Sequence, residues 1–197
     1  MLGVILCGGK SSRMGEDKGL LLFKNETWAK LAYKKVSAFD LQTVLSIGPR
    51  QFQKYNSFFL AEQLIPDQSG LNLAGPLQGI ISIHSRFPGE DMVVLACDLP
   101  NMQPQALEEL LRQYRKNERY EAIAFSFGDQ IEPLCSIYTA RGLAKILALH
   151  EKKALMRQSM IHVLETIRTK YIVPNERWRP FFKNMNSVSD LGELNDK

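Results

Sequence analysis

The stretch with the most chemical potential lies at the start of the chain, where residues 3–18 read GVILCGGKSSRMGEDK. A short apolar run ends at Gly8 and Gly9, and a loop rich in Gly, Ser, Lys and Arg continues to Lys18. Glycines at the end of a strand let the backbone approach a ligand closely and point its N–H groups at an anion. Arg13 and Lys18 add two positive charges. The sequence therefore predicts a polyphosphate site at the start of the fold.

This loop does not match two common phosphate-binding motifs. The pattern GxxxxGK[ST] of the P-loop is absent, and so is the GxGxxG fingerprint of dinucleotide-binding proteins. The alternative is an ordinary glycine-rich turn between a strand and a helix. In that interpretation the positions of Arg13 and Lys18 at the far end of the loop would be coincidental.

Asp98 is the second candidate, because it directly follows the apolar run 92–97. In open α/β sheets, ligands bind at the carboxyl ends of the strands. A carboxylate there can hold Mg²⁺, which keeps several waters and bridges to phosphate oxygens. The alternative is an aspartate that caps a helix or closes a turn. A phosphate loop at the end of another strand favours the metal site.

Two further pairs of residues carry weaker signals. Asp67 could accept hydrogen bonds from a guanine edge or a ribose, and Gly75 allows close approach of a ligand before a helix that starts at Pro76. Asn184 and Asn186 stand two residues apart, so in an extended segment they point the same way. The alternatives are a commonplace loop aspartate for the first pair and turn or capping chemistry for the second.

The elements that must position these residues alternate between strand-like and helix-like patterns. Strands are predicted at residues 2–7, 44–47, 92–97, 122–127, 134–138 and 171–173, and helices at 27–38, 51–58, 76–86, 105–116, 139–150 and 154–167. The run 92–97 is apolar throughout, as expected for a parallel strand that is covered on both faces. This alternation predicts an α/β fold with a mostly parallel sheet, in a single domain over residues 1–197.

The composition narrows the classes of protein that fit. The net charge of +4 is spread along the chain without a dense basic tract, so nucleic acid is not an expected partner. No apolar run is long enough to span a membrane, and the start of the chain lacks the features of a secretory signal. Cys7, Cys97 and Cys135 all lie in apolar runs, which predicts reduced, buried thiols in a cytoplasmic protein.

Together these motifs resemble the molybdenum cofactor guanylyltransferases, also called molybdopterin-guanine dinucleotide synthases. That family opens with LAGGxSxRMGxDK, and residues 6–18 read LCGGKSSRMGEDK, with Cys7 in place of the usual alanine. Residues 98–100, DLP, match the family's DxP motif, and residues 75–79, GPLQG, match its GPLxG. Residues 184–191, NMNSVSDL, match its late NxNxxxDL. The motifs therefore span most of the chain in the family's order.

The resemblance implies a Rossmann-like nucleotidyltransferase fold, a three-layer α/β sandwich that binds GTP with Mg²⁺ and transfers GMP to the terminal phosphate of the molybdenum-bearing pterin. The implied nucleotide-binding residues, mainly in the N-terminal half, are Leu6, Cys7, Gly8, Gly9, Arg13, Lys18, Asp67, Gly75 and Asp98. Arg13, Lys18 and Asp98 would be catalytic, with Asp98 holding the metal. Asn184 and Asn186 would lie on the pterin side, formed mainly by the C-terminal half.

The chain departs from the family pattern at one place, and several alternative functions remain. Family members often have an asparagine near the end of the second strand, where this chain has Gly48 and Pro49. A cytidylyltransferase for the same cofactor is the nearest alternative, although that family usually shows LAAG and lacks GPLxG. More distant alternatives are a nucleotidyltransferase for sugar phosphates or lipid precursors and a non-catalytic GTP-binding regulatory module. Transient contact with proteins that supply or accept the cofactor is also expected, and no membrane contact.

Overall fold

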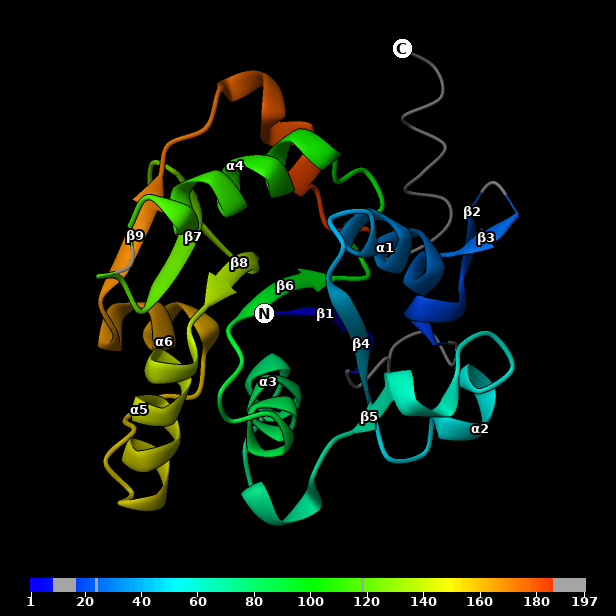
Figure 1. Cartoon of the computed structure of the whole chain (residues 1–197), viewed down its shortest axis with the longest axis horizontal. Helices are drawn as coiled ribbons and strands as arrows, with labels where there is room; N and C mark the ends of the chain where they lie inside the picture. The colour runs from blue at the N-terminus through cyan, green and yellow to red at the C-terminus, as the bar shows by residue number, and fades with distance from the viewer. Residues whose placement is uncertain (9–16, 24, 118, 186–197) are drawn as a thin grey trace.

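A seven-stranded sheet with the order β5-β4-β1-β6-β8-β7-β9 forms the centre of the protein (Figure 1). The computed structural model describes residues 1–8, 17–23, 25–117 and 119–185. The strands are β1 (Leu2–Leu6), β4 (Gln42–Ile47), β5 (Leu64–Pro66), β6 (Met92–Ala96), β7 (Ala122–Phe127), β8 (Gln130–Tyr138) and β9 (Thr169–Ile172). All neighbours are parallel except on the two sides of β8. The prediction of a mostly parallel sheet is therefore confirmed.

Helices cover both faces of this sheet and complete a three-layer sandwich (Figure 1). On one face lie α1 (Trp28–Ser37) and α4 (Pro104–Arg115), and on the other lie α3 (Pro76–Arg86), α5 (Ala140–Glu151) and α6 (Met160–Thr166). The shorter elements are α2 (Phe52–Tyr55), the hairpin of β2 (Leu22–Phe23) and β3 (Glu26–Thr27), and the 3-10 turns η1 (Lys18–Leu20), η2 (Ala61–Gln63), η3 (Ser69–Leu71) and η4 (Glu176–Phe182). No helix among the described residues is both long and apolar enough to cross a bilayer.

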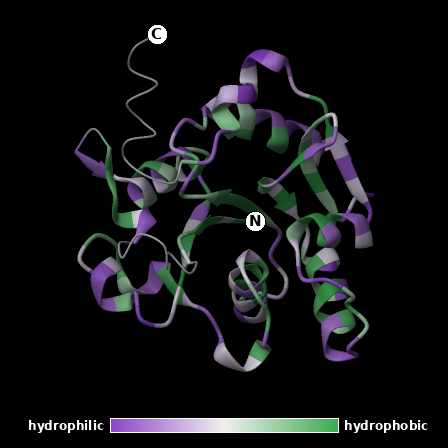
Figure 2. Cartoon of the chain, turned by 180° about the vertical axis from the view of Figure 1, so that it is seen from behind, coloured by the Kyte–Doolittle hydropathy of each residue, from purple (hydrophilic) through white to green (hydrophobic). Residues whose placement is uncertain are grey.

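The core consists of two apolar layers, one on each face of the sheet. Successive side chains of a strand point to opposite faces, so Ile5 packs in the layer with α1 and α4, whereas Val4 and Leu6 pack in the layer with α3 and α5. All five residues of β1 and of β6 are buried. Figure 2 shows the most hydrophobic residues concentrated in these central strands. A strand that is covered by helices on both faces needs apolar side chains along its whole length.

Topology brings four strand ends to one edge of the sheet. Because β5, β4, β1 and β6 are all parallel, their carboxyl ends lie side by side in that order. β8 runs antiparallel to β6, so its first residues lie toward the same edge. We call this the carboxyl edge of the sheet, and it is where the predicted polar residues follow their strands.

Three elements differ from the prediction in length. The helix expected over 51–58 covers only Phe52–Tyr55. The helix expected over 154–167 begins only at Met160, because Lys153 adopts a left-handed φ of 56° and Ser159 caps the new helix through its hydroxyl. The strand expected at 134–138 starts at Gln130, directly after a turn in which Gly128 has a φ of 65°. β8 also bulges, since Phe125 pairs with Glu132 whereas Ala124 pairs with Ser136. β5 and η4 were not predicted.

Candidate nucleotide-binding site

The end of β1 remains tied to both neighbouring strands. The backbone N–H groups of Cys7 and Gly8 both donate to the carbonyl of Ser46, at 2.9 and 3.1 Å. On the other side, the N–H of Cys97 donates to the carbonyl of Leu6 at 3.1 Å. A side-chain carbon at Gly8 would lie 3.4 Å from the Asp67 carboxylate. Gly8 therefore brings the backbone directly beside a second predicted site residue.

The residues around Lys18 are held by Asp17. Its carboxylate accepts hydrogen bonds from the N–H of Gly19 at 3.1 Å, from the hydroxyl of Tyr55 at 2.9 Å and from the side-chain amide of Gln51. A side-chain carbon at Gly19 would lie 2.1 Å from the Tyr55 hydroxyl, so only glycine fits there. Asp17 thus fixes the start of η1, the element that carries Lys18.

Asp98 follows β6 with its carboxyl group largely buried. Its Oδ1 is buried and has no hydrogen-bond partner among the described residues. Burial raises the pKa of Asp98, and the positive charge of Lys18 opposes this shift. The predicted lysine is therefore close enough for its positive charge to act on the predicted carboxyl group. Leaving a buried oxygen unpaired destabilises a fold unless something else binds it.

The loop that carries Asp98 is braced from two sides. Lys35 of α1 donates from Nζ to the carbonyl of Pro100, and the backbone N–H of Met185 donates to the carbonyl of Asp98 at 2.9 Å. Burial lowers the pKa of Lys35 to about 8. These contacts hold the carboxylate in place through the backbone rather than through its own oxygens.

The donor set suits magnesium better than a transition metal. The described residues contain no group of three or more His, Cys, Asp or Glu side chains that could hold a metal ion. Magnesium needs no such cage, because it keeps several waters and takes one or two carboxylates together with substrate phosphates. The unpaired Oδ1 of Asp98 fits this coordination.

A cavity of about 800 Å³ opens beside β4 and β5 at the carboxyl edge. Its lining residues are Gly48, Pro49, Arg50, Gln51, Asp67, Leu73, Ala74, Gly75 and Gln78. Asp67 accepts a hydrogen bond from the Ser46 hydroxyl at 3.2 Å, and burial raises its pKa against the effect of that bond. The cavity is large enough for a nucleoside-sized ligand and presents a carboxylate acceptor in its wall.

Glycines shape the helix that borders this cavity. Gly75 has a φ of 60° directly before the first residue of α3, a conformation that favours glycine. At Gly79 a side-chain carbon would lie 2.0 Å from the Ser46 hydroxyl and 3.3 Å from Asp67 Oδ1. Gly79 therefore lets α3 pack closely enough for Asp67 and Ser46 to meet beneath it.

Gln51 belongs to the site, although the sequence did not single it out. Its Oε1 accepts from the N–H of Gly48, and its Nε2 donates to Asp17 and to the carbonyl of Cys7 at 3.4 Å. One side chain thus joins the ends of β1 and β4 at the point where family members often have an asparagine. The only signal in the sequence is a polar residue soon after a strand end, which is too common to be diagnostic.

The predicted pterin-side residues are only partly described. Asn184 is exposed and adjoins Met185, whose backbone N–H contacts Asp98. Asn184 therefore lies next to the carboxyl edge although it is 86 residues from Asp98 in the chain. Gly9, Arg13 and Asn186 lie outside the described residues, and their roles stay predictions.

Comparisons with known proteins agree with this architecture. The model of a family described as "MobA-like NTP transferase domain" matches residues 3–167. A probable molybdenum cofactor guanylyltransferase from a Geobacillus species is 26% identical over 98% of this chain and 97% of its own. One from Bacillus cereus is 29% identical, covering 97% of this chain and 94% of its own. A crystal structure of molybdopterin-guanine dinucleotide biosynthesis protein A from Archaeoglobus fulgidus has a TM-score of 0.76 at 24% identity, covering 98% and 96% of the two chains.

Proposed function

Because this chain belongs to the MobA-like NTP transferase domain family and is thus an enzyme of the nucleotidyltransferase type, we propose that it transfers GMP from GTP to the terminal phosphate of a molybdopterin-type cofactor. Pyrophosphate is the second product. The observation that carries the proposal is the buried, unpaired oxygen of Asp98, next to Lys18 and at the same edge as the large cavity. The names of the similar proteins support the choice of substrates.

The order of the strand ends suggests how GTP lies across the site. The guanosine occupies the cavity beside β5 and β4, where Asp67 can accept hydrogen bonds from the guanine edge or the ribose. The triphosphate crosses the end of β1, where Gly8 keeps the backbone accessible. The α-phosphate then lies toward Lys18 and Asp98, and the acceptor approaches from the side of Asn184.

The chemistry follows from positioning and charge. An oxygen of the acceptor phosphate attacks the α-phosphorus in line, the bond from that phosphorus to the bridging oxygen breaks, and pyrophosphate leaves. This nucleophile is already an anion, so no strong general base is needed. Lys18, together with Arg13, neutralises charge that develops on the phosphate oxygens. Magnesium held by Asp98 would supply a Lewis acid at the same oxygens.

Magnesium-dependent release of pyrophosphate tests this proposal. The reaction is run with GTP or CTP, each with and without a molybdopterin-type acceptor, and the guanine dinucleotide product is identified by mass spectrometry. We expect pyrophosphate release with GTP and not with CTP, and only when the acceptor is present. Preference for CTP would assign the chain to cytidylyl transfer. Tight GTP binding without release under any condition would instead favour the regulatory GTP-binding module.

A further inference from the structure

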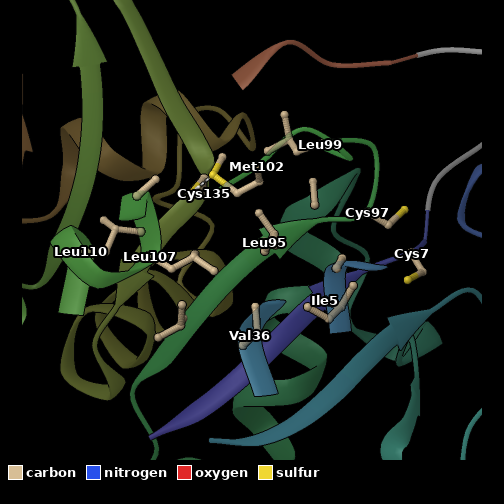
Figure 3. Packing of buried hydrophobic residues seen from close by; sticks show 14 of the residues in the cluster. Ile5, Cys7, Val36, Leu95, Cys97, Leu99, Met102, Leu107, Leu110 and Cys135 are labelled. Atoms are coloured by element: carbon tan, nitrogen blue, oxygen red, sulfur yellow. Dashed lines mark hydrogen bonds between the residues drawn. The ribbon is translucent and has the colours of Figure 1, made fainter. Parts of the chain in front are cut away.

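Two of the three cysteines lie side by side at adjacent strand ends, each next to a residue of the proposed site. Cys7 follows β1 and Cys97 follows β6, one residue beyond the registered pair Leu6 and Ala96. The backbone bond from Cys97 to Leu6 shows that strand pairing continues to this point. Both side chains belong to the same core layer. Figure 3 shows the two side chains next to each other at the strand ends.

The spacing of neighbouring strands matches what a disulfide needs. Adjacent strands lie about 4.7–4.9 Å apart, and disulfides join residues whose Cα atoms are about 4.4–6.8 Å apart. The side chains also start from the same face of the sheet, as bond formation requires. Cys135 lies in the same core layer, but its sulfur contacts Met102 and its side chain is fully buried.

We propose that Cys7 and Cys97 form a reversible disulfide when the protein meets hydrogen peroxide, and that this bond switches the transferase off. Both residues keep a small exposed fraction, 7% and 6%, whereas Cys135 has 0%. The pair is therefore more accessible to a small oxidant than the third thiol is. The switching half of this inference rests on the proposed function, and the disulfide itself does not.

The reaction balances with peroxide as the only oxidant. The Cys7 sulfur attacks one oxygen of hydrogen peroxide, the O–O bond breaks, and a sulfenic acid and one water form. The Cys97 sulfur then attacks the sulfenic sulfur, the S–O bond breaks, and a second water leaves as the S–S bond forms. The two thiols lose two electrons and two protons in total, and peroxide is reduced to two waters. An external dithiol reverses the oxidation.

The effect on activity follows from the neighbours of the two cysteines. The sulfurs must move to about 2.05 Å from each other, from a wider non-bonded contact. Cys7 precedes Gly8, and its carbonyl accepts the Gln51 amide at 3.4 Å. Cys97 precedes Asp98, the proposed metal ligand. Closing the bond thus pulls together the backbone that faces the triphosphate and the carboxylate that faces the metal.

Peptide mapping and turnover under oxidation test the inference together. The full-length protein is treated with hydrogen peroxide, blocked with an alkylating agent, digested without reductant and analysed by mass spectrometry. We expect a cross-linked pair of peptides containing Cys7 and Cys97, about 2 Da lighter than the sum of the reduced peptides. Turnover with GTP and acceptor should fall at least tenfold and return with dithiothreitol.

Each variant is compared with itself before and after oxidation, so that its own basal activity does not matter. Cys7→Ala and Cys97→Ala should lose most of the peroxide-sensitive inhibition, whereas Cys135→Ala should keep it. Absence of the 7–97 cross-link would overturn the disulfide, and a cross-link with unchanged turnover would overturn the switch. If the reduced protein transfers no nucleotide, the proposed function fails, and peptide mapping still decides the thiol pair.

Discussion

The carboxyl group of Asp98 combines burial with an unpaired oxygen, and this has a measurable consequence for stability. Burial raises its pKa in the folded protein above the value in the unfolded chain. The stabilising, protonated form is fully populated below the unfolded pKa and is lost as the pH rises through the folded pKa. Above the folded pKa the ionised group therefore destabilises the fold until a cation binds. An amide at this position would remove that effect and also the proposed metal ligand.

We predict that Asp98→Asn raises the melting temperature at pH 7 without magnesium and removes the stabilisation that magnesium and GTP give the wild type. Turnover should fall by about 10²-fold or more, the scale of losing one oriented electrostatic group, and Lys18→Ala should do the same. Thermal unfolding and steady-state kinetics measure the two effects. Asp129→Asn, at an exposed position, serves as the control. Near-normal turnover of Asp98→Asn would remove the metal assignment.

Residues with a strong local context were predictable, and residues defined by distant partners were not. Asp98 and Gly75 stand directly after a buried strand and before a helix, so their sequence neighbours reveal their place at a sheet edge. Asp17 stands in the opening motif, but its hydrogen bond to Gln51 exists only because the ends of β1 and β4 lie next to each other. Such a bridge, whose partners are 34 positions apart in the chain, has no pattern that a single sequence can show.

Helix α1 supports the site through the partly buried ammonium group of Lys35. Burial lowers the pKa of Lys35 from 10.5 to about 8, and its Nζ donates to the carbonyl of Pro100. Below pH 8 the group is charged in both the folded and the unfolded states, and its burial destabilises the fold. Between about pH 8 and 10.5 the folded protein has released the proton and the unfolded chain has not. Stability from this residue therefore rises with pH over that range.

We predict that the wild type gains up to about 3 kcal/mol of unfolding free energy relative to Lys35→Met between pH 8 and 10.5, at 1.36 kcal/mol per pKa unit. Turnover of Lys35→Met should fall about tenfold at pH 7, because the loop carrying Asp98 loses its brace. Urea unfolding across this pH range measures the first effect. Lys34→Met, on the exposed face of the same helix, is the matched control. Parallel stability curves for wild type and Lys35→Met would contradict the prediction.

The contact between α3 and β4 depends on the missing side chain of Gly79. We predict that Gly79→Ala destabilises the protein by about 1–3 kcal/mol, because the added carbon would start 2.0 Å from the Ser46 hydroxyl. GTP binding should weaken as well, since Asp67 Oδ1 would lie 3.3 Å from the same carbon. Urea unfolding and calorimetric titration measure these effects. Gly89→Ala, where a side chain meets open space, should change neither, and equal behaviour of the two variants would refute the contact.

The elements that the sequence predicted well were those with a sustained apolar pattern. β1, β6, α3 and α4 each bury a continuous strand or one face of a helix, and the pattern marks them along their length. β5 has only three residues, too few for a clear pattern. η4 depends on the packing of Phe182 against Phe125, two residues that lie far apart in the chain. The extra length of β8 came from pairing with β7, a tertiary contact that overrides weak local preference.

The last described residue, Met185, packs against residues from early in the chain and lies beside the loop that carries Asp98. Met185 is fully buried against Leu21 and Trp28, residues that follow the first strand and η1. Its backbone N–H also contacts the carbonyl of Asp98, so the chain from η4 is anchored at the carboxyl edge. Asn184, the neighbour of this anchor in the chain, therefore lies next to the loop that carries Asp98. The last described segment therefore lies at the same edge of the sheet as Asp98.

We predict that Met185→Ala raises the KM for the acceptor about tenfold or more and changes the KM for GTP by less than about threefold, because the anchor holds Asn184 and not the cavity. Stability should fall by about 2–5 kcal/mol, the usual loss for truncating a buried methionine. Met156→Ala, at a methionine that is 87% exposed, should change none of these quantities. Steady-state kinetics with each substrate varied in turn separates the two KM values. An equal rise in both KM values would show that the two sides of the site are not separable. An unchanged KM for the acceptor in a destabilised protein would show that the C-terminal segment does not form the acceptor side.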